Sequence, residues 1–199
     1  MLQQFASYDP LAVFTLSNST LSNYRIRLAE VEDLARIPAI EAAAAKQFEP
    51  YVSQLEISVD HLSGLTPMTF LKRAQLEKRI WVAVLENQPV GFIVAKFLIE
   101  SCFIVELDVL PAYSRQGIGS ALIEICCEGA RSRNHTQLTL TTFRYVPWNI
   151  PFYQQCGFEI LPIERCSSEL SAIVQHEARY GFVQKHRVVM RRILSRKRE

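Results

Sequence analysis

The stretch Leu110–Arg133, LPAYSRQGIGSALIEICCEGARSR, is the most informative part of the chain. An apolar run ends at Leu110, a proline follows it, and Gly117 and Gly119 stand where a helix is expected to begin. In a helix interior each glycine costs about 0.5–1 kcal/mol relative to alanine. The two glycines therefore need a physical reason, and the close approach of a ligand to the backbone would supply one.

The residues that follow the glycines predict an amphipathic helix. Its apolar positions recur at steps of three and four residues, which places one stripe of side chains on a core: Ile118, Ala121, Leu122, Ile125 and Cys126. The start of such a helix presents unpaired N–H groups and the positive end of the helix dipole, and both attract anions. Glycine has no Cβ to hold a phosphate away, and Arg115 adds a positive charge. The stretch predicts a cradle for a diphosphate, with a tight, closely packed strand-to-helix turn as the other explanation.

Two common phosphate-binding motifs do not fit this stretch. No GK[ST] follows the glycines, so it is not a P-loop, and Leu122 stands where a dinucleotide fingerprint has its third glycine.

Helices and strands mix along the rest of the chain, with no internal repeat and no clear linker. Alternating and short apolar runs predict strands at 24–29, 80–86, 90–99, 101–110, 137–143, 158–162 and 186–194. Helical patterns predict helices at 31–48 (with an initial turn ended by Pro38), 66–79, from about 117, 149–156 and 167–181. We therefore expect one α+β domain over residues 24–194, an N-terminal extension at 1–23 and a basic tail at 195–199.

The composition is that of a globular protein. Of the 199 residues, 49% are hydrophobic and 21% are charged, and no window approaches the roughly 18 apolar residues of a membrane span. The first basic residue is Arg25, so the N-terminus lacks the basic start of a secretory signal, and we expect a cytoplasmic protein with no membrane partner. The net charge is +2, and adjacent Arg191 and Arg192 would face opposite sides of a strand, which argues against nucleic acid as a partner.

The five cysteines and four histidines show no metal-ligand spacing. We expect no metal, and we interpret the thiols as core or inert residues, with Cys156 left open because it lies close to a possible site.

Two motifs together resemble those of the GNAT superfamily of acetyl-CoA-dependent N-acetyltransferases. The glycine stretch is similar to the family's pyrophosphate-binding loop, [QR]-x-x-G-x-[GA]. The segment NIPFYQQCGFEIL, residues 149–161, is similar to the short helix and strand that follow the acetyl-CoA cleft in the family. The resemblance covers about Tyr24 to Leu194 in the right order of elements. Ser114 is a departure, because the family usually has Gln or Arg three residues before the first glycine; Arg115 or the backbone amides would then substitute.

The resemblance implies a three-layer α/β/α fold, in which a mixed, mostly antiparallel sheet is flanked by helices and splayed where acetyl-CoA enters. It implies transfer of an acetyl group from acetyl-CoA to a primary amine of a small molecule or a protein, and pairing into homodimers is common among relatives. Cofactor contacts are implied for the following residues: Asp108, Val109, Ser114, Arg115, Gln116, Gly117, Ile118, Gly119, Ser120, Asn149 and Phe152. A non-catalytic acyl-CoA-binding regulatory module and an enzyme for longer acyl-CoA are the alternatives.

Two residues are candidates for proton transfer. Tyr153 occupies the position where many family members carry the acid that protonates the CoA sulfur, and the alternative is a tyrosine that only packs. Glu106 and Asp108 alternate with apolar residues, so both should face one side of a strand, about 7 Å apart. The family often draws a general base from this strand, and Glu106 is our candidate, with a structural hydrogen-bonding role as the alternative.

Three further residues are candidates around the cleft. Glu41 falls on the apolar stripe of the first helix, where a carboxylate needs a cation or several donors. It would either hold an acceptor ammonium or, as we favour, have an internal partner such as an arginine. Asn149 precedes Ile150 and Pro151 and fits a helix N-cap, while the resemblance implies contact with the pantetheine arm. Trp148 would either wall the acceptor cavity or just pack.

Overall fold

The computed structural model describes residues 24–62 and 64–195. The predicted N-terminal extension at 1–23 and residues 196–199 of the predicted tail lie outside the described residues.

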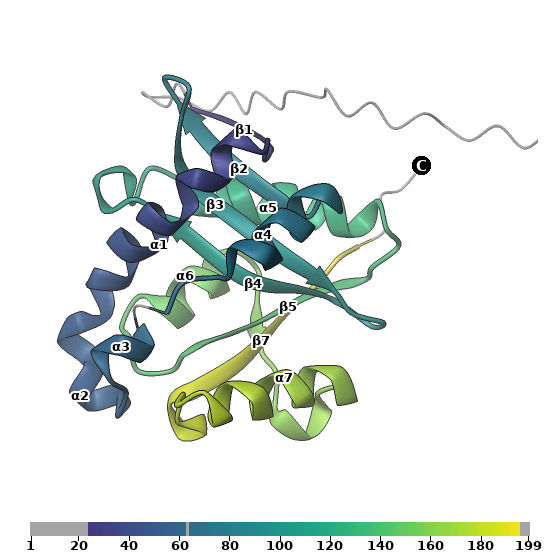
Figure 1. Cartoon of the computed structure of the whole chain (residues 1–199). Coiled ribbons are helices and arrows are strands. Elements are labelled where there is room, and N and C mark those ends of the chain that lie inside the picture. The colour runs from purple at the N-terminus through teal and green to yellow at the C-terminus, as the bar shows by residue number, and fades with distance from the viewer. Residues whose placement is uncertain (1–23, 63, 196–199) are drawn as a thin grey trace, which may run out of the picture.

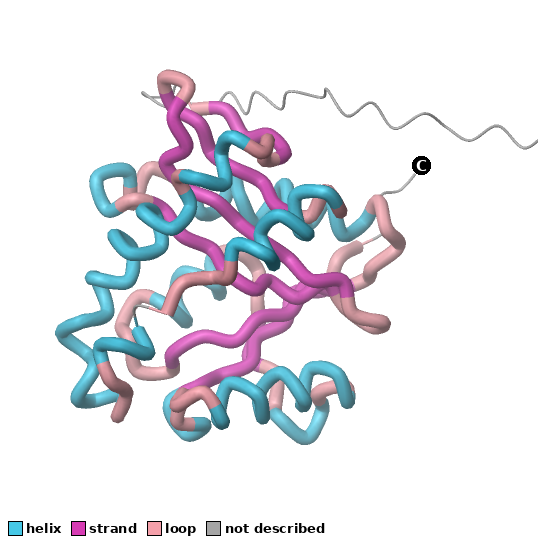
Figure 2. The backbone as a smooth tube through the Cα atoms, in the orientation of Figure 1, coloured by secondary structure: helices cyan, strands magenta, loops and turns pink. Residues whose placement is uncertain are grey.

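A seven-stranded sheet forms the middle layer, in the order β1-β2-β3-β4-β5-β7-β6 (Figures 1 and 2). The strands are β1 Arg25–Leu28, β2 Ile80–Leu85, β3 Gln88–Phe97, β4 Cys102–Val109, β5 Gln137–Phe143, β6 Glu159–Ile160 and β7 Arg187–Ile193. All neighbours pair antiparallel except β4 and β5, which are parallel. The expected mixed, mostly antiparallel sheet is confirmed.

Helices cover both faces of this sheet (Figure 1). They are α1 Ile37–Ala45, α2 Val52–Leu55, α3 Val59–Leu62, α4 Met68–Leu76, α5 Ile118–Arg131, α6 Asn149–Gln155 and α7 Ser168–Arg179. Because both faces are covered, the inner strand β2 (IWVAVL) is a continuous apolar run rather than an alternating one.

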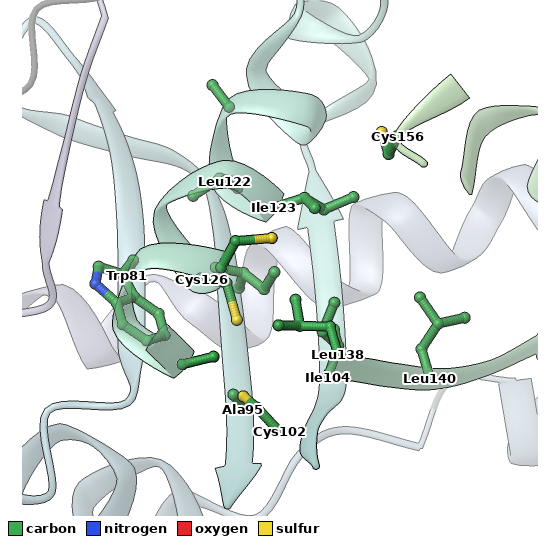
Figure 3. Packing of buried hydrophobic residues seen from close by; sticks show 14 of the residues in the cluster. Trp81, Ala95, Cys102, Ile104, Leu122, Ile123, Cys126, Leu138, Leu140 and Cys156 are labelled. Carbon is green, nitrogen blue, oxygen red and sulfur yellow. The ribbon is translucent and has the colours of Figure 1, made fainter. Parts of the chain in front are cut away.

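The core on the α5 face explains the apolar stripe of that helix. Leu122 and Cys126 pack there against strand residues such as Ile104 and Leu138 (Figure 3). Ile118 belongs to the same core. On the opposite face α1 and α4 pack on β2 and β3, and α7 packs on Phe103 and Val189. The expected three-layer α/β/α arrangement follows from these separate cores.

The cysteines are thiols rather than disulfides. Cys102, Cys126, Cys127 and Cys156 are buried, and Cys166 is half-buried. Burial raises the pKa of the Cys127 thiol to about 12, so it stays protonated and unreactive at neutral pH.

The segment between the first and second predicted helices differs most from the sequence prediction. The chain continues from α1 through a 3₁₀ segment, Lys46–Tyr51, into α2 and α3, where no helix was predicted. These two helices have four residues each, too short to show a helical period. The first predicted helix itself divides into a 3₁₀ turn, Glu32–Ala35, and α1, with Pro38 in the first turn of α1.

Candidate functional site

The candidate site is a cavity that opens where β4 and β5 part. Their parallel pairing is limited to Cys102 with Leu138 and Phe103 with Thr139. Beyond these pairs both strands line one continuous cavity of about 1000 Å³. The cavity extends from the glycine loop before α5 to Phe182 and Arg187 near the start of β7. The splay expected in the sheet is therefore the feature that creates the site.

The glycine loop forms one end of this cavity. Gly117 is the N-cap of α5 with φ 80°, a left-handed conformation that favours glycine. A Cβ at Gly117 would meet nothing nearer than the Tyr24 hydroxyl at 3.9 Å, whereas a Cβ at Gly119 would lie 3.1 Å from Cζ of Phe152. Close packing thus accounts for Gly119, while the space beside Gly117 is open towards the cavity.

Most of the residues predicted for the cofactor come together along this end. The cavity is lined by all of them but one: Asp108, Val109, Ser114, Arg115, Gly117, Ile118, Gly119, Ser120, Asn149 and Phe152. Gln116 is not part of the lining; its amide donates to the Ala112 carbonyl at 3.4 Å on the exposed side of the loop. Arg115 is exposed and has φ 59°.

A bulge in β4 directs the two predicted acids. The β3–β4 register shifts between Val94 and Ala95, which leaves Val105 as the extra residue. Beyond the bulge Glu106 lies opposite Val94 and Asp108 lies opposite Phe92, both of which pack towards α1. The two carboxylates therefore share one face of the strand, and both line the cavity.

Glu41 of α1 reaches the same part of the cavity, but not in the way the sequence suggested. Its carboxylate accepts a hydrogen bond from the Thr66 backbone N–H, with both oxygens at 3.3 Å. None of the ion pairs formed within residues 24–62 and 64–195 includes Glu41, so the favoured arginine partner is wrong. The turn before α4 supplies a free N–H at this point, and the N–H takes the place of a cation.

Burial raises the pKa of all three acids, and neighbouring charges add to the rise at Glu106 and Asp108. Burial, followed by the charge of Glu41, raises the pKa of Glu106 to about 7, and the guanidinium of Arg187 opposes the rise. The pKa of Asp108 is raised well above its usual range by burial and by the charges of Glu106 and Glu41. Burial also raises the pKa of Glu41, against the hydrogen bonds from Thr66. A carboxyl group with a pKa near 7 can exchange a proton at neutral pH.

Tyr153 of α6 lines the same cavity as these acids. Its half-buried ring lies edge-on to Phe152 and Phe158, with centroids 5.0 Å and 5.7 Å away. Burial, and then the charges of Glu106 and Asp108, raise the pKa of its hydroxyl well above the ordinary value. Tyr153 therefore keeps its proton throughout the neutral range.

The predicted capping role of Asn149 is wrong. Trp148 holds the N-cap position of α6 and already has helical dihedrals, φ −94° and ψ −19°, and no side chain caps the helix. An N-cap side chain needs an extended backbone to reach the free N–H groups, and that conformation is absent at this helix start. Asn149 is instead the first helical residue, buried and in the cavity lining.

Trp148 also lines the cavity, and its ring is 39% exposed. It lies against the rings of Phe48 and Tyr51, with centroids 5.8 Å and 5.3 Å away.

Sequence reasoning missed the far end of the cavity. Arg187 of β7 donates from Nε to Glu177 at 3.2 Å and from Nη2 to the Thr141 hydroxyl at 2.8 Å. Its guanidinium lies over the rings of Phe143 and Phe182, 4.8 Å and 5.1 Å from their centroids. No local motif marks these residues, because they meet only through the long-range pairing of β5 with β7.

The described part of the chain contains no group of three or more His, Cys, Asp or Glu residues that could hold a metal ion. No helix within it is long and apolar enough to cross a membrane.

Comparison with known proteins agrees with this geometry. Residues 77–160 match the family model of the acetyltransferase (GNAT) domain. An uncharacterized protein of Bacillus subtilis, YxbD, is 36% identical over 75 residues, which are 38% of this chain and 46% of that relative. The match thus spans less than half of the relative's length.

Solved structures with the same fold are enzymes of several specificities. The ribosomal-protein-S18-alanine N-acetyltransferase of Escherichia coli aligns with a TM-score of 0.61 at 17% identity, over 88% of this chain and 97% of that chain. The PaiA N-acetyltransferase of Thermoplasma acidophilum, solved with coenzyme A, aligns with a TM-score of 0.63 at 16% identity. The alignment covers 86% of this chain and 99% of that chain. The N-acetylglutamate synthase of Neisseria gonorrhoeae, solved with coenzyme A and N-acetyl-glutamate, aligns with 0.65 at 16% identity, over 89% of this chain but 37% of that one.

At these identities the solved structures establish the fold. Residues 77–160 match the acetyltransferase (GNAT) domain, and the described chain has the fold of these N-acetyltransferases.

Proposed function

We propose that this protein transfers the acetyl group of acetyl-CoA directly to a primary amine. One observation carries the proposal: a single cavity joins a helix start suited to a diphosphate with a carboxyl group of pKa about 7 and a phenol that keeps its proton. The first feature suits binding of CoA, and the other two supply a base and an acid for the transfer.

The glycine loop fits the diphosphate of acetyl-CoA on its own geometry. The N–H groups at the start of α5 are free of capping side chains, and the space beside Gly117 is open. Arg115 is an exposed cation in the same loop, which would offset the absence of Gln or Arg at Ser114. The strand residues Asp108 and Val109, beyond the bulge, line the cavity between the glycine loop and Glu106.

Glu106 and Tyr153 then have complementary roles. Glu106 accepts the proton that the acceptor ammonium must lose, directly or through a water. The free amine attacks the thioester carbonyl, so that a carbon–nitrogen bond forms and the carbon–sulfur bond breaks. Tyr153 gives its proton to the departing sulfur and regains one from the nitrogen, which must lose a second proton to become the amide. The proton held by Glu106 returns to solvent. The charge of Arg187 helps to keep Glu106 ionised, because it opposes the burial that raises its pKa.

Calorimetric titration with acetyl-CoA tests the first half of the proposal. Arg115→Asn removes the loop cation and keeps a residue that tolerates positive φ, so binding should weaken about tenfold while the fold is kept. Lys78→Asn is the matched control, because Lys78 is another exposed cation with φ 51° but lies outside the cavity lining. Equal binding by wild type and Arg115→Asn would remove Arg115 from the site.

Mass spectrometry of a panel of amines tests the second half. A direct product assay is preferred because the half-buried thiol of Cys166 would react with a thiol dye. Binding of acetyl-CoA without any acetylated amine would favour the regulatory acyl-CoA-binding module instead. Faster transfer from a longer acyl-CoA in the same assay would reassign the donor.

A further inference from the structure

The far end of the cavity, away from the glycine loop, has a continuous aromatic wall formed by Phe48, Phe143, Trp148 and Phe182. All four residues line the cavity. Neighbouring rings contact each other: the ring centroid of Phe48 lies 5.6 Å from that of Phe143 and 5.8 Å from that of Trp148. The centroids of Phe143 and Phe182 are 6.0 Å apart. Ala44, Ala45, Leu62 and Leu65 extend the same apolar lining. An aromatic surface of this kind binds apolar groups by burial and cations by their attraction to the ring face.

The acid cluster, Glu41, Glu106 and Asp108, lies in the same cavity and has no cation of its own. Within residues 24–62 and 64–195, no lysine or arginine forms an ion pair with any of the three. Burial raises the pKa of each carboxyl group. The charge of Glu41 adds to the rise at Glu106, and the charges of Glu106 and Glu41 add to the rise at Asp108. A ligand that carries one positive charge would relieve both effects.

Arg187, whose charge acts on Glu106, is already satisfied. Glu177 neutralises it, Thr141 accepts from it, and two rings cover its faces. Its side chain is 14% exposed. Arg187 is therefore poorly suited to bind a carboxylate of the acceptor, and a carboxylate would also meet the charge of the acid cluster.

From this arrangement we infer that the acceptor is a monoamine with an apolar body and no carboxylate. Its ammonium lies at the acid cluster, and its body, most simply an aryl-alkyl group, lies on the aromatic wall. A second ammonium is disfavoured, because the wall that receives the body offers no second carboxylate that is free of a cation. This inference rests on the proposed acetyl transfer and names the substrate class for it.

Four matched amines test the inference with the full chain and saturating acetyl-CoA. Ethylamine lacks the body of 2-phenylethylamine, phenylalanine adds a carboxylate to it, and 1,4-diaminobutane replaces the ring by a second ammonium. Burial of a phenyl group predicts that kcat/KM for 2-phenylethylamine exceeds that for ethylamine about 30- to 100-fold. Phenylalanine and 1,4-diaminobutane should both fall at least about tenfold below 2-phenylethylamine.

A variant pair connects the preference to the wall. Trp148→Ala should reduce the ratio of kcat/KM between 2-phenylethylamine and ethylamine about tenfold. Tyr145→Ala, the control, removes an aromatic ring that is 47% exposed and lies outside the cavity lining, and should leave that ratio unchanged.

The outcomes separate the inference from the proposed function. Preference for phenylalanine or 1,4-diaminobutane over 2-phenylethylamine would overturn the inference and leave acetyl transfer standing. If acetyl-CoA binds but no amine is acetylated, calorimetric titration of the CoA complex with 2-phenylethylamine decides. Binding at the stoichiometry of one site, weakened in Trp148→Ala, would support the inferred ligand class while refuting its acetylation, and no binding would overturn both.

Discussion

Replacement of Glu106 by glutamine tests the proposed base through two independent quantities. Burial and the charge of Glu41 raise the pKa of Glu106 to about 7, so at pH 6 about nine-tenths of the carboxyl groups are protonated and cannot accept a proton. The wild-type kcat/KM should therefore fall about tenfold per pH unit below pH 7. Glu106→Gln should lower kcat/KM at pH 8 by about 100-fold and remove this acidic limb.

The same shift predicts a change in stability. The group binds its proton more tightly when folded than at its ordinary pKa of 4.5, so its contribution is fully present below pH 4.5 and is lost as pH rises to about 7. The difference between these two pKa values corresponds to a free energy of about 3 kcal/mol, at about 1.36 kcal/mol per pH unit. Screening of the charge by water in the cavity reduces it to about 2 kcal/mol. Glu106→Gln should thus exceed the wild type in free energy of unfolding by about 2 kcal/mol at pH 8, and match it at pH 4.5. Urea denaturation at both pH values measures the difference.

Two further variants control this experiment. Glu41→Gln removes the charge that raises the pKa of Glu106, so the acidic limb of kcat/KM should move to lower pH. Glu100→Gln changes an exposed acid outside the cavity lining and should alter neither quantity. An acidic limb that survives unchanged in Glu106→Gln would refute the assignment of the base, whatever the effect on stability.

Two other variants have definite expected results. Tyr153→Phe should lower kcat about 100-fold with acetyl-CoA affinity kept, because it removes only the hydroxyl proposed to protonate the sulfur; unchanged turnover would dismiss the acid. Gly129→Ala should destabilise the fold by about 1–3 kcal/mol in urea denaturation, because the new Cβ would lie 2.7 Å from Cη2 of the buried Trp81 and closer still to Cζ2. A stability equal to the wild type would mean that the indole can shift.

Strong local patterns made much of the fold predictable. The helix after Gly117 and the strand at 137–143 were found because each has a clear apolar pattern and well-marked ends. By contrast, α2 and α3 have no period to detect, and tertiary contacts support them: Leu55 is fully buried, and Glu56 pairs with Lys185. Such helices depend on residues far away in the chain, which a local pattern does not reveal.

The candidate site divides in the same way. The glycine loop and Tyr153 lie in motifs, and Glu106 stands out as an acid in an apolar strand. Arg187 carries no local signal, because the register of β5 with β7 brings it to the cavity. Phe182 lies in the cavity lining before β7 and also has no motif around it. The partner of Glu41 was mistaken for a similar reason: a backbone N–H, which every residue except proline offers, satisfies a carboxylate without leaving a mark in the sequence.

The question that the two glycines raise has a different answer at each position, and Gly117 allows a decisive test. Its φ of 80° already favours glycine, so the presence of glycine here does not by itself show that a ligand approaches the backbone. Gly117→Asn adds a Cβ in the open space of the cavity but keeps a residue that tolerates this conformation, so the fold should lose no more than about 1 kcal/mol. Gly157→Asn is the matched control, with φ 81° and a place outside the cavity lining. If Gly117→Asn alone loses acetyl-CoA binding by calorimetry, the glycine is there for the ligand; if both variants bind as the wild type does, the turn before α5 is the whole reason for it.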